Sequence, residues 1–260
     1  MRFDKFFETM GPMVAMAFAN GGFKTADGKF NFEGREGVPL DELDLSGEVP
    51  TVIKLLGADV VRITEGADFT IAVEGEEEAK ARMRFLAEDG SLMVLRDREG
   101  WRGGPSSTVT ITMPAPEQIE LLGSGAIHCD ALAQEAKIAI LGSGKVETHG
   151  IETRSLKVKF AGSGSYKASG TTGELKLSIA GSGNAKLGSL KADKVQIAIT
   201  GSGDATFACD GEVDAKITGS GKVTVRGSAR CRVKSFGSGV LICEPAGSVT
   251  LDHEEIGQGK

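Results

Sequence analysis

The chain has 260 residues, with 37 glycines but only 12 phenylalanines, one tyrosine and one tryptophan, and a formal net charge of −6. No stretch approaches the roughly 20 consecutive apolar residues of a membrane-spanning helix, which excludes a helical membrane protein. The glycine content instead suits many tight turns around an aliphatic core.

Residues 1–37 combine an apolar pattern of helical spacing with a Gly-rich lead-in, and Gly11-Pro12 should kink or break the helix. We expect this segment to cap the open end of the fold that follows. A membrane-surface helix and a signal peptide cleaved after Ala19 are alternatives, although Asp4 and Glu8 neutralise the region that a signal peptide needs positive. The apolar residues are Phe3, Phe6, Phe7, Met10, Met13, Val14, Ala17 and Phe18.

Residues 38–116 contain several short segments with strand-like alternation. Asp89-Gly90 separates two of them and is a good hairpin turn. We predict an irregular β-region that continues into the repeats described below, not a separate catalytic domain. The predicted strands are 51–56, 60–64, 69–73, 81–87, 91–96 and 108–113.

Trp101, the only tryptophan, lies among three arginines in residues 96–104. This combination can stack on a sugar ring, which makes Trp101 a candidate ligand-binding residue. Alternatively, the ring covers an apolar edge of the core.

Residues 117–247 repeat the triplet Gly-Ser-Gly seven times at intervals of 18 to 20 residues. Such a period is typical of a solenoid. No copy precedes a helical pattern or carries the Gly-Lys-Ser/Thr ending, so a phosphate-binding loop is not expected. The predicted corner glycines are Gly123, Gly125, Gly142, Gly144, Gly162, Gly164, Gly181, Gly183, Gly201, Gly203, Gly219, Gly221, Gly237 and Gly239.

Apolar and polar residues alternate on both sides of each triplet, as in strands with one buried face. Each repeat is therefore a strand, a corner, a second strand and a return of about six residues. One such coil buries its apolar side chains only by stacking on the next, at about 4.8 Å. We predict an all-β parallel β-helix of about seven regular coils, with glycine where a corner needs positive φ or leaves no room for a Cβ. Residues 248–260 are expected to form a C-terminal tail.

The repeat region is basic, with 16 Lys or Arg and 12 Asp or Glu in residues 117–243. Outward positions before the corners could stack into one stripe that attracts acidic polysaccharide, teichoic acid or nucleic acid. Nucleic acid is not favoured, because no aromatic side chains alternate with the basic ones. The alternative is a solvated face, interrupted by Asp214. The stripe comprises Lys137, Lys157, Lys159, Lys176, Lys216, Arg232 and Lys234.

The four cysteines fall into two groups. Cys129 and Cys209 lie four coils apart, about 19 Å of stacking, which is too far for a disulfide. Cys231 and Cys243 flank the last full corner and both point inward. We predict that this pair approaches closely and can form a disulfide, although reduced thiols would also suit the core.

Catalytic and metal-binding patterns are weak. A polysaccharide lyase would need clustered carboxylates beside Lys or Arg on adjacent coils, and no such cluster is evident. His128, His149 and His253 fall at different phases of the coil, so no metal site is expected. No Ser-His-Asp set has local support. We predict no catalytic residue and no cofactor.

Several segments together resemble the bacterial head GIN domain family, described as candidate autotransporter adhesins. They are GADVVRITEGADFTIAVEGE, EDGSLMVLRD, VTITMPAP and the seven Gly-Ser-Gly triplets. The resemblance covers roughly residues 45–244. It implies a right-handed, single-stranded β-helix without an assigned activity, on exported or envelope-associated proteins. Because the signal-peptide pattern is incomplete, a cytoplasmic location also stays open.

These observations predict a non-catalytic structural or adhesion-type module. It would present a rigid, partly basic face to an anionic polysaccharide or another envelope component. One alternative is a carbohydrate-active β-helix protein, either polysaccharide-binding or lyase-like. Another is a scaffold that assembles into homo-oligomers through the ends of the β-helix.

Overall fold

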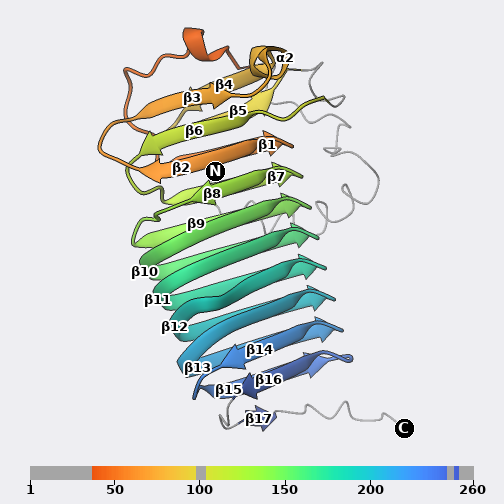
Figure 1. Ribbon diagram of the computed structural model, residues 1–260. Coiled ribbons are helices and arrows are strands. Elements are labelled where there is room, and N and C mark those ends of the chain that lie inside the picture. The colour runs from red at the N-terminus through yellow and green to blue at the C-terminus, as the bar shows by residue number, and fades with distance from the viewer. Residues whose placement is uncertain (1–36, 98–103, 245–248, 252–260) are drawn as a thin grey trace.

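The computed structural model describes residues 37–97, 104–244 and 249–251, which form the predicted all-β parallel β-helix (Figure 1). Successive coils stack along one axis, and the arrowheads of β9 to β13 line up along one edge. The strands are β1 (Val52–Gly57), β2 (Val60–Glu65), β3 (Thr70–Glu74), β4 (Met83–Glu88), β5 (Ser91–Arg96), β6 (Thr108–Met113), β7 (Gln118–Gly123), β8 (Ala126–Cys129), β9 (Glu135–Gly142), β10 (Lys145–Gly162), β11 (Ser165–Gly181), β12 (Asn184–Gly201), β13 (Asp204–Gly219), β14 (Lys222–Arg226), β15 (Arg230–Phe236), β16 (Val240–Glu244) and β17 (Val249–Leu251). The helical elements are η1 (Leu40–Glu42) and α2 (Glu77–Ala81).

The corners divide the stack into two faces. The first face holds the strands before a corner, in the order β4, β5, β1, β7, β9, the ends of β10 to β13, β15 and β17. The second face holds the strands after a corner, in the order β3, β6, β2, β8, the beginnings of β10 to β13, β14 and β16. Among the described strands, β3 with β6 and β4 with β5 are the antiparallel pairs.

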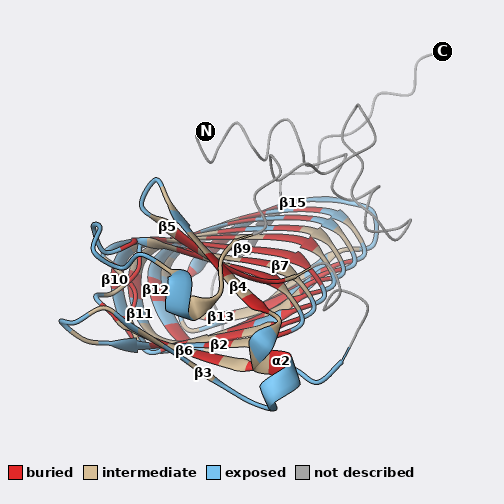
Figure 2. Ribbon diagram, turned by 90° about the horizontal axis from the view of Figure 1, so that it is seen from above, coloured by how far each residue is buried: buried red, intermediate tan, exposed pale blue. Residues whose placement is uncertain are grey.

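Parallel register stacks apolar side chains on one another inside the coils. On the first face Ile53, Ile119 and Ile138 pair in consecutive coils, and all three are completely buried. On the second face Ile127 pairs with Val146 in the same way. Burying one such side chain contributes about 1.5–3 kcal/mol. The buried positions line the inside of every coil (Figure 2), so one continuous core holds the stack together.

The first glycine of each triplet has a conformation that other residues rarely adopt. All seven have φ between +112° and +127°. A Cβ at Gly162 would lie 2.5 Å from the carbonyl oxygen of Gly142, its counterpart one coil earlier. That carbonyl accepts a hydrogen bond from the Ser163 backbone N–H at 3.0 Å. The serine contributes its backbone to the stack, and its side chain is exposed.

The structure contains an eighth corner of this kind, which the repeat analysis missed. Gly57, Ala58 and Asp59 join β1 to β2, and Gly57 has φ of +134°. The Ser124 backbone N–H donates to the Gly57 carbonyl at 3.1 Å, as the later serines do. Asp59 replaces the third glycine, so a search for the triplet does not find it. The Leu-Leu-Gly that precedes both this corner and the next was the available signal.

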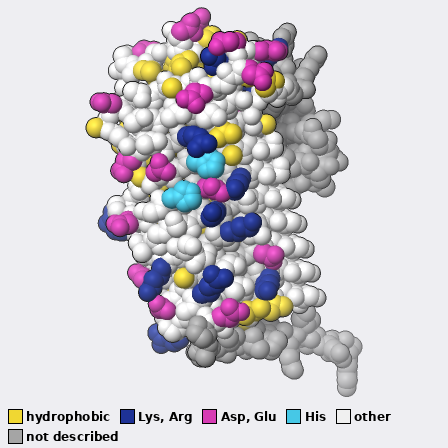
Figure 3. Space-filling model, viewed as in Figure 1, with side chains coloured by type: hydrophobic (Ala, Val, Ile, Leu, Met, Phe, Trp, Pro, Cys, Tyr) yellow, Lys and Arg dark blue, Asp and Glu magenta, His cyan; other side chains and the backbone are white. Residues whose placement is uncertain are grey.

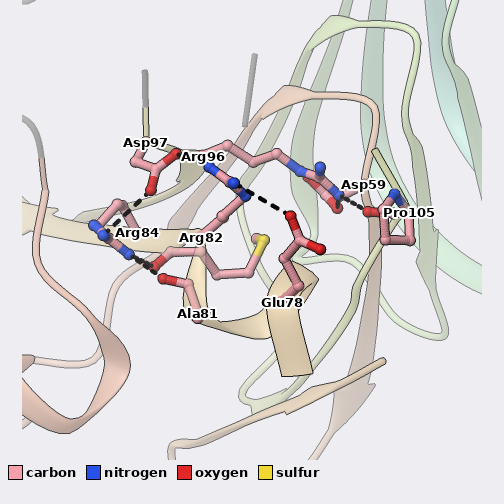
Figure 4. Close-up of polar contacts among 9 residues, drawn as sticks. Asp59, Glu78, Ala81, Arg82, Arg84, Arg96, Asp97 and Pro105 are labelled. Atoms are coloured by element: carbon pink, nitrogen blue, oxygen red, sulfur yellow. Dashed lines mark hydrogen bonds and ion pairs between the residues drawn. The ribbon is translucent and has the colours of Figure 1, made fainter. Parts of the chain in front are cut away.

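Asp59 gives this corner a different means of closure. Its carboxylate is completely buried and accepts two hydrogen bonds from the Arg96 guanidinium, at 2.6 and 2.7 Å. It also accepts the Ser107 backbone N–H at 2.8 Å. Arg96 donates in turn to the Pro105 carbonyl (Figure 4). The hydrogen bond to Asp59 raises the pKa of Arg96. Hydrogen bonds between Asp59 and Ser107 and between Arg96 and Pro105 therefore hold the connection between β5 and β6 against the corner at Gly57.

Strands β3 and β4, with α2 between them, close the N-terminal end of the stack. Because β3 and β4 run antiparallel to β6 and β5, they end the parallel ladder on both faces. Arg82 pairs with Glu78 of α2 at 3.2 Å, and Arg84 pairs with Asp97 at 3.4 Å (Figure 4). These contacts fix the helix to the β4–β5 hairpin.

One predicted strand was placed too early. The segment 81–87 was expected to be extended, but β4 begins at Met83 and α2 ends at Ala81. Glu77 to Ala81 are good helix formers, and an ion pair between Glu77 and Lys80 adds to their preference. The turn between β4 and β5 is the predicted one, with positive φ at Asp89 and Gly90.

The helix predicted in residues 1–37 lies outside the described residues, except for Gly37 itself. Within the described part of the chain, no helix is long and apolar enough to cross a membrane.

Alanine substitution of one corner glycine, Gly162, and of Gly150 within β10 should separate steric conflict from backbone strain. Gly162→Ala should lower the free energy of unfolding by about 3 kcal/mol or more, because both φ and a backbone oxygen oppose the Cβ. Gly150 has φ of +63° and open space around it, so Gly150→Ala should cost about 1 kcal/mol. Urea unfolding measures both, and equal losses would contradict the steric explanation.

Candidate binding groove

The outward side chains of the first face form columns, because the strands are in register. One column contains Lys157, Lys176, Gln196, Asp214 and Arg232, from β10 to β15. The neighbouring column, two residues further along each strand, contains Lys159, Ser178, Ala198, Lys216 and Lys234. Successive members of a column are separated by about 4.8 Å, the strand spacing.

These columns enclose a shallow groove of about 610 Å³. Its floor is low at Ser178 and Ala198, whose short side chains are exposed. Lys159 and Lys216 stand at either end of this low stretch, three coils or about 14 Å apart. The groove exists because two consecutive coils carry small residues where the flanking coils carry lysine.

The groove has a strong excess of positive charge. Among the described residues that line it are six basic side chains and one acidic side chain, Asp214. Arg232 pairs with Asp214 at 3.3 Å, and Lys176 pairs with Glu174 outside the groove at 2.9 Å. Lys216 and Lys234 are exposed and make no ion pair within the described chain. The groove is therefore positioned to attract anions.

The structure gathers most of the predicted ligand-binding residues in this groove. Lys137 belongs to the same column but lies one coil before the groove. Trp101 lies outside the described residues, so its predicted contact with a sugar stays untested. Arg96, which accompanies Trp101 in the sequence, is buried against Asp59. The predicted residues that line the groove are Lys157, Lys159, Lys176, Lys216, Arg232 and Lys234.

The second face carries histidines together with both acidic and basic side chains (Figure 3). Glu147 lies between His128 and His149, with side-chain nitrogen to Oε2 distances of 3.3 and 3.9 Å. Lys145 also pairs with Glu147, and this contact is the main cause of the lowered pKa of that carboxylate. The two histidines are thus closer than their coil phases suggested. Within the described ranges, no three His, Cys, Asp or Glu side chains are arranged to hold a metal ion.

The four cysteines are free thiols. Cys231 and Cys243 come from β15 and β16, on opposite faces of the last coils. Burial raises the pKa of the Cys231 thiol to about 12, and Cys243 adds to the shift. The Cys231 thiol itself donates to the Ala229 carbonyl at 3.8 Å. Cys231 belongs to the core and Cys243 packs against it, while their close approach and their disulfide stay predictions.

Residues 50–229 match the family described as "Putative auto-transporter adhesin, head GIN domain". The matched span includes most of the groove, while Arg232 and Lys234 lie beyond it. No curated protein matches the chain.

Three crystal structures illustrate the shared fold. A "putative adhesin" from Bacteroides fragilis aligns with a TM-score of 0.69 at 23% identity, covering 75% of this chain and 93% of that chain. A "putative lipid binding protein" from Parabacteroides distasonis aligns with a TM-score of 0.59 at 20% identity, covering 75% and 94%. A "putative adhesin" from Parabacteroides merdae aligns with a TM-score of 0.54 at 19% identity, covering 75% and 92%. The TM-scores show that these proteins share the β-helix fold. Because all three identities are below 25%, the likeness concerns the fold alone.

The thiol pair can be tested by oxidation. Mild treatment with diamide should join Cys231 to Cys243, because both side chains pack in the core of the last coils. Intact-mass spectrometry would detect the loss of two thiol hydrogens, and peptide mapping would identify the bridge. Cys243→Ser should abolish the bridge, whereas Cys129→Ala should leave it intact. Oxidation should be faster above pH 8, since the thiolate is the reactive form. Two thiols that stay reduced under these conditions would contradict the prediction.

Proposed function

Because the chain belongs to the head GIN domain family, we propose that it is a non-catalytic, adhesion-type module whose groove binds an anionic polymer. An acidic polysaccharide of the cell envelope is the polymer that we favour. The observation that carries this proposal is the charge of the groove, where six basic side chains face one acidic side chain.

The type of basic residue favours a polymer over a single compact anion. Five of the six are lysines, whose ammonium groups act as hydrated point charges on flexible stems. A planar, bidentate contact with one carboxylate or phosphate would favour arginine instead. Lysines at regular intervals can follow the repeating charges of a polymer without demanding one geometry. Binding of this kind is expected to weaken as salt rises.

The rigidity of the face supports the same function. The groove-lining strands β10 to β13 are paired on both sides, so little backbone ordering is needed when a ligand binds. The groove is open along its length, which allows an extended chain to lie in it. A rigid face with repeated weak contacts is well suited to adhesion, because several contacts act together.

Absence of catalysis forms part of the proposal. A lyase or hydrolase acting on a polysaccharide needs carboxylates or another base positioned to transfer protons. The carboxylate among the described groove residues, Asp214, is held by Arg232. The arrangement therefore supports binding of an anionic chain and provides no pair of acids for cleavage.

Self-assembly through an end of the stack is a second possibility, which the C-terminal end favours. The N-terminal end is closed by the antiparallel strands β3 and β4. At the other end β16 pairs with β14 on one side, and Phe236 and Val240 are 43% and 49% exposed. Assembly of two copies through this edge would give a closed dimer. Light scattering at increasing protein concentration would detect such a dimer as an increase in mean mass.

Charge reversal in the groove provides the main test. Lys157→Glu combined with Lys216→Glu should weaken binding to alginate, used as an acidic polysaccharide, on the order of tenfold or more at low salt. The matched control is Lys167→Glu with Lys186→Glu, which makes the same charge change at exposed positions of the second face. Biolayer interferometry at two salt concentrations gives the affinities. Equal losses in the two variants would show that total charge, and not the groove, controls binding.

Asp214 allows the opposite test. Asp214→Asn removes the negative charge in the groove and releases Arg232 from its ion pair. We expect tighter binding of alginate than for the unaltered protein, with a steeper dependence on salt. Duplex DNA serves as a second probe, and a preference for it would redirect the proposal to nucleic acid. No binding to either polymer at low salt would refute the proposal.

A further inference from the structure

A second feature of the first face is a stripe of apolar side chains on its outer surface. Its members lie immediately before the corners in β1, β7, β9 and β10, and at the matching position of β5. Register pairs Leu56 with Leu122, Leu122 with Leu141, and Leu141 with Ala161. Each follows an inward core residue, as Leu141 follows Ile140, and therefore points away from the core. We call this set the outer stripe; it comprises Leu95, Leu56, Leu122, Leu141 and Ala161.

Four of the five side chains of the outer stripe are buried although they face outward, and Leu122 is half-buried. Leu56 is 7% exposed, Leu141 2% and Ala161 4%, and none of them belongs to the core cluster. The same column continues through Ala180, which is half-buried, to Thr200 and Thr218, which are exposed. Every member of the column, buried or exposed, lies on a strand that is paired with a neighbour on both sides. The sheet itself therefore does not explain the burial.

The described helices and strands do not cover the outer stripe either. In the described part of the chain, β1, β7 and β9 have their main contacts with the strands beside them in the stack. The two short helical elements lie at the N-terminal end, where η1 contacts β4. These contacts leave an apolar row on the outside of the sheet, which favours a partner that packs on it.

We propose that the outer stripe is the docking site of residues 1–36 of the same chain. This segment has eight apolar residues with helical spacing, and the other segments outside the described ranges are much shorter. Val38 bridges to Phe85 of β4, which pairs with β5. The segment therefore joins the fold at the end of the stack where the stripe begins.

The dimensions of the two surfaces agree. Four strand spacings separate β5 from β10, which is about 19 Å. A helical pattern over residues 3–18 would extend about 24 Å. Burying an apolar stripe under an apolar helix face would remove both from water.

This inference changes the role first expected of the N-terminal segment. Strands β3 and β4 already close the end of the stack, so the segment acts along the side. Ala161 is two residues from Lys159, which lines the groove. The segment would therefore border the groove, while its docking does not depend on what the groove binds.

Cysteine accessibility tests the proposal in the full 260-residue chain. Leu141→Cys and Thr200→Cys place a thiol in the same column, one in the outer stripe and one beyond it. Both are made with Cys243→Ser, which removes the half-buried native thiol. Maleimide should label position 141 at least about tenfold more slowly than position 200. Similar rates would overturn the proposal, since the stripe would then be open.

A change in the segment then identifies the cover. Phe7→Asp with Val14→Asp should raise the labelling rate at position 141 to near that at position 200. Thr9→Asp with Asn20→Asp adds the same charge at polar positions and should leave the rate low. Circular dichroism confirms that each variant is folded. Slow labelling that persists with Phe7→Asp and Val14→Asp would overturn the proposal. If slow labelling of position 141 were then lost on dilution, the cover would be a second copy of the chain. If it were lost in detergent, the cover would be bound lipid.

Discussion

The whole stack depends on one backbone contact that is repeated from coil to coil. The N–H of the middle corner residue donates to the carbonyl of the glycine that begins the previous corner, as Ser163 does to Gly142. This contact brings successive corners so close that a Cβ on the first glycine would collide with that carbonyl. Glycine is therefore required by both the conformation and the spacing. With the corners in register, the strands on either side are in register as well.

Strict register converts each position of the repeat into a column on the surface. Inward positions form the apolar core, and outward positions form columns whose character changes along the axis. On the first face the column before the corner is apolar from Leu95 to Ala161, and it contains Thr200 and Thr218 in later coils. The basic groove lies beside the later coils, where Ser178 and Ala198 leave a hollow between lysines. One sheet thus presents an apolar half and a basic half.

Local features of the sequence were sufficient to predict the repeating part of the fold. The alternation around Tyr166 and Leu177 places their side chains inside, and both are buried. The basic residues from Lys157 to Lys234 could be assigned to one face because their phase in the repeat is the same. The corner at Gly57 was missed because Asp59 occupies the position of a glycine. Helix α2 was missed because its five residues are too few for a periodic pattern to be distinct.

The sequence by itself determined the coil, its corners and which side chains face inward, since all three follow from a pattern that returns within 20 residues. Only the tertiary structure decided that β1 lies between β5 and β7, and that the two ends of the stack differ. That arrangement depends on contacts between segments without a common pattern, such as Asp59 with Arg96, 37 residues apart. The groove also belongs to the tertiary structure, because its hollow arises from the relative heights of side chains in four neighbouring coils. Periodicity reports the direction of a side chain, whereas packing decides what lies beside it.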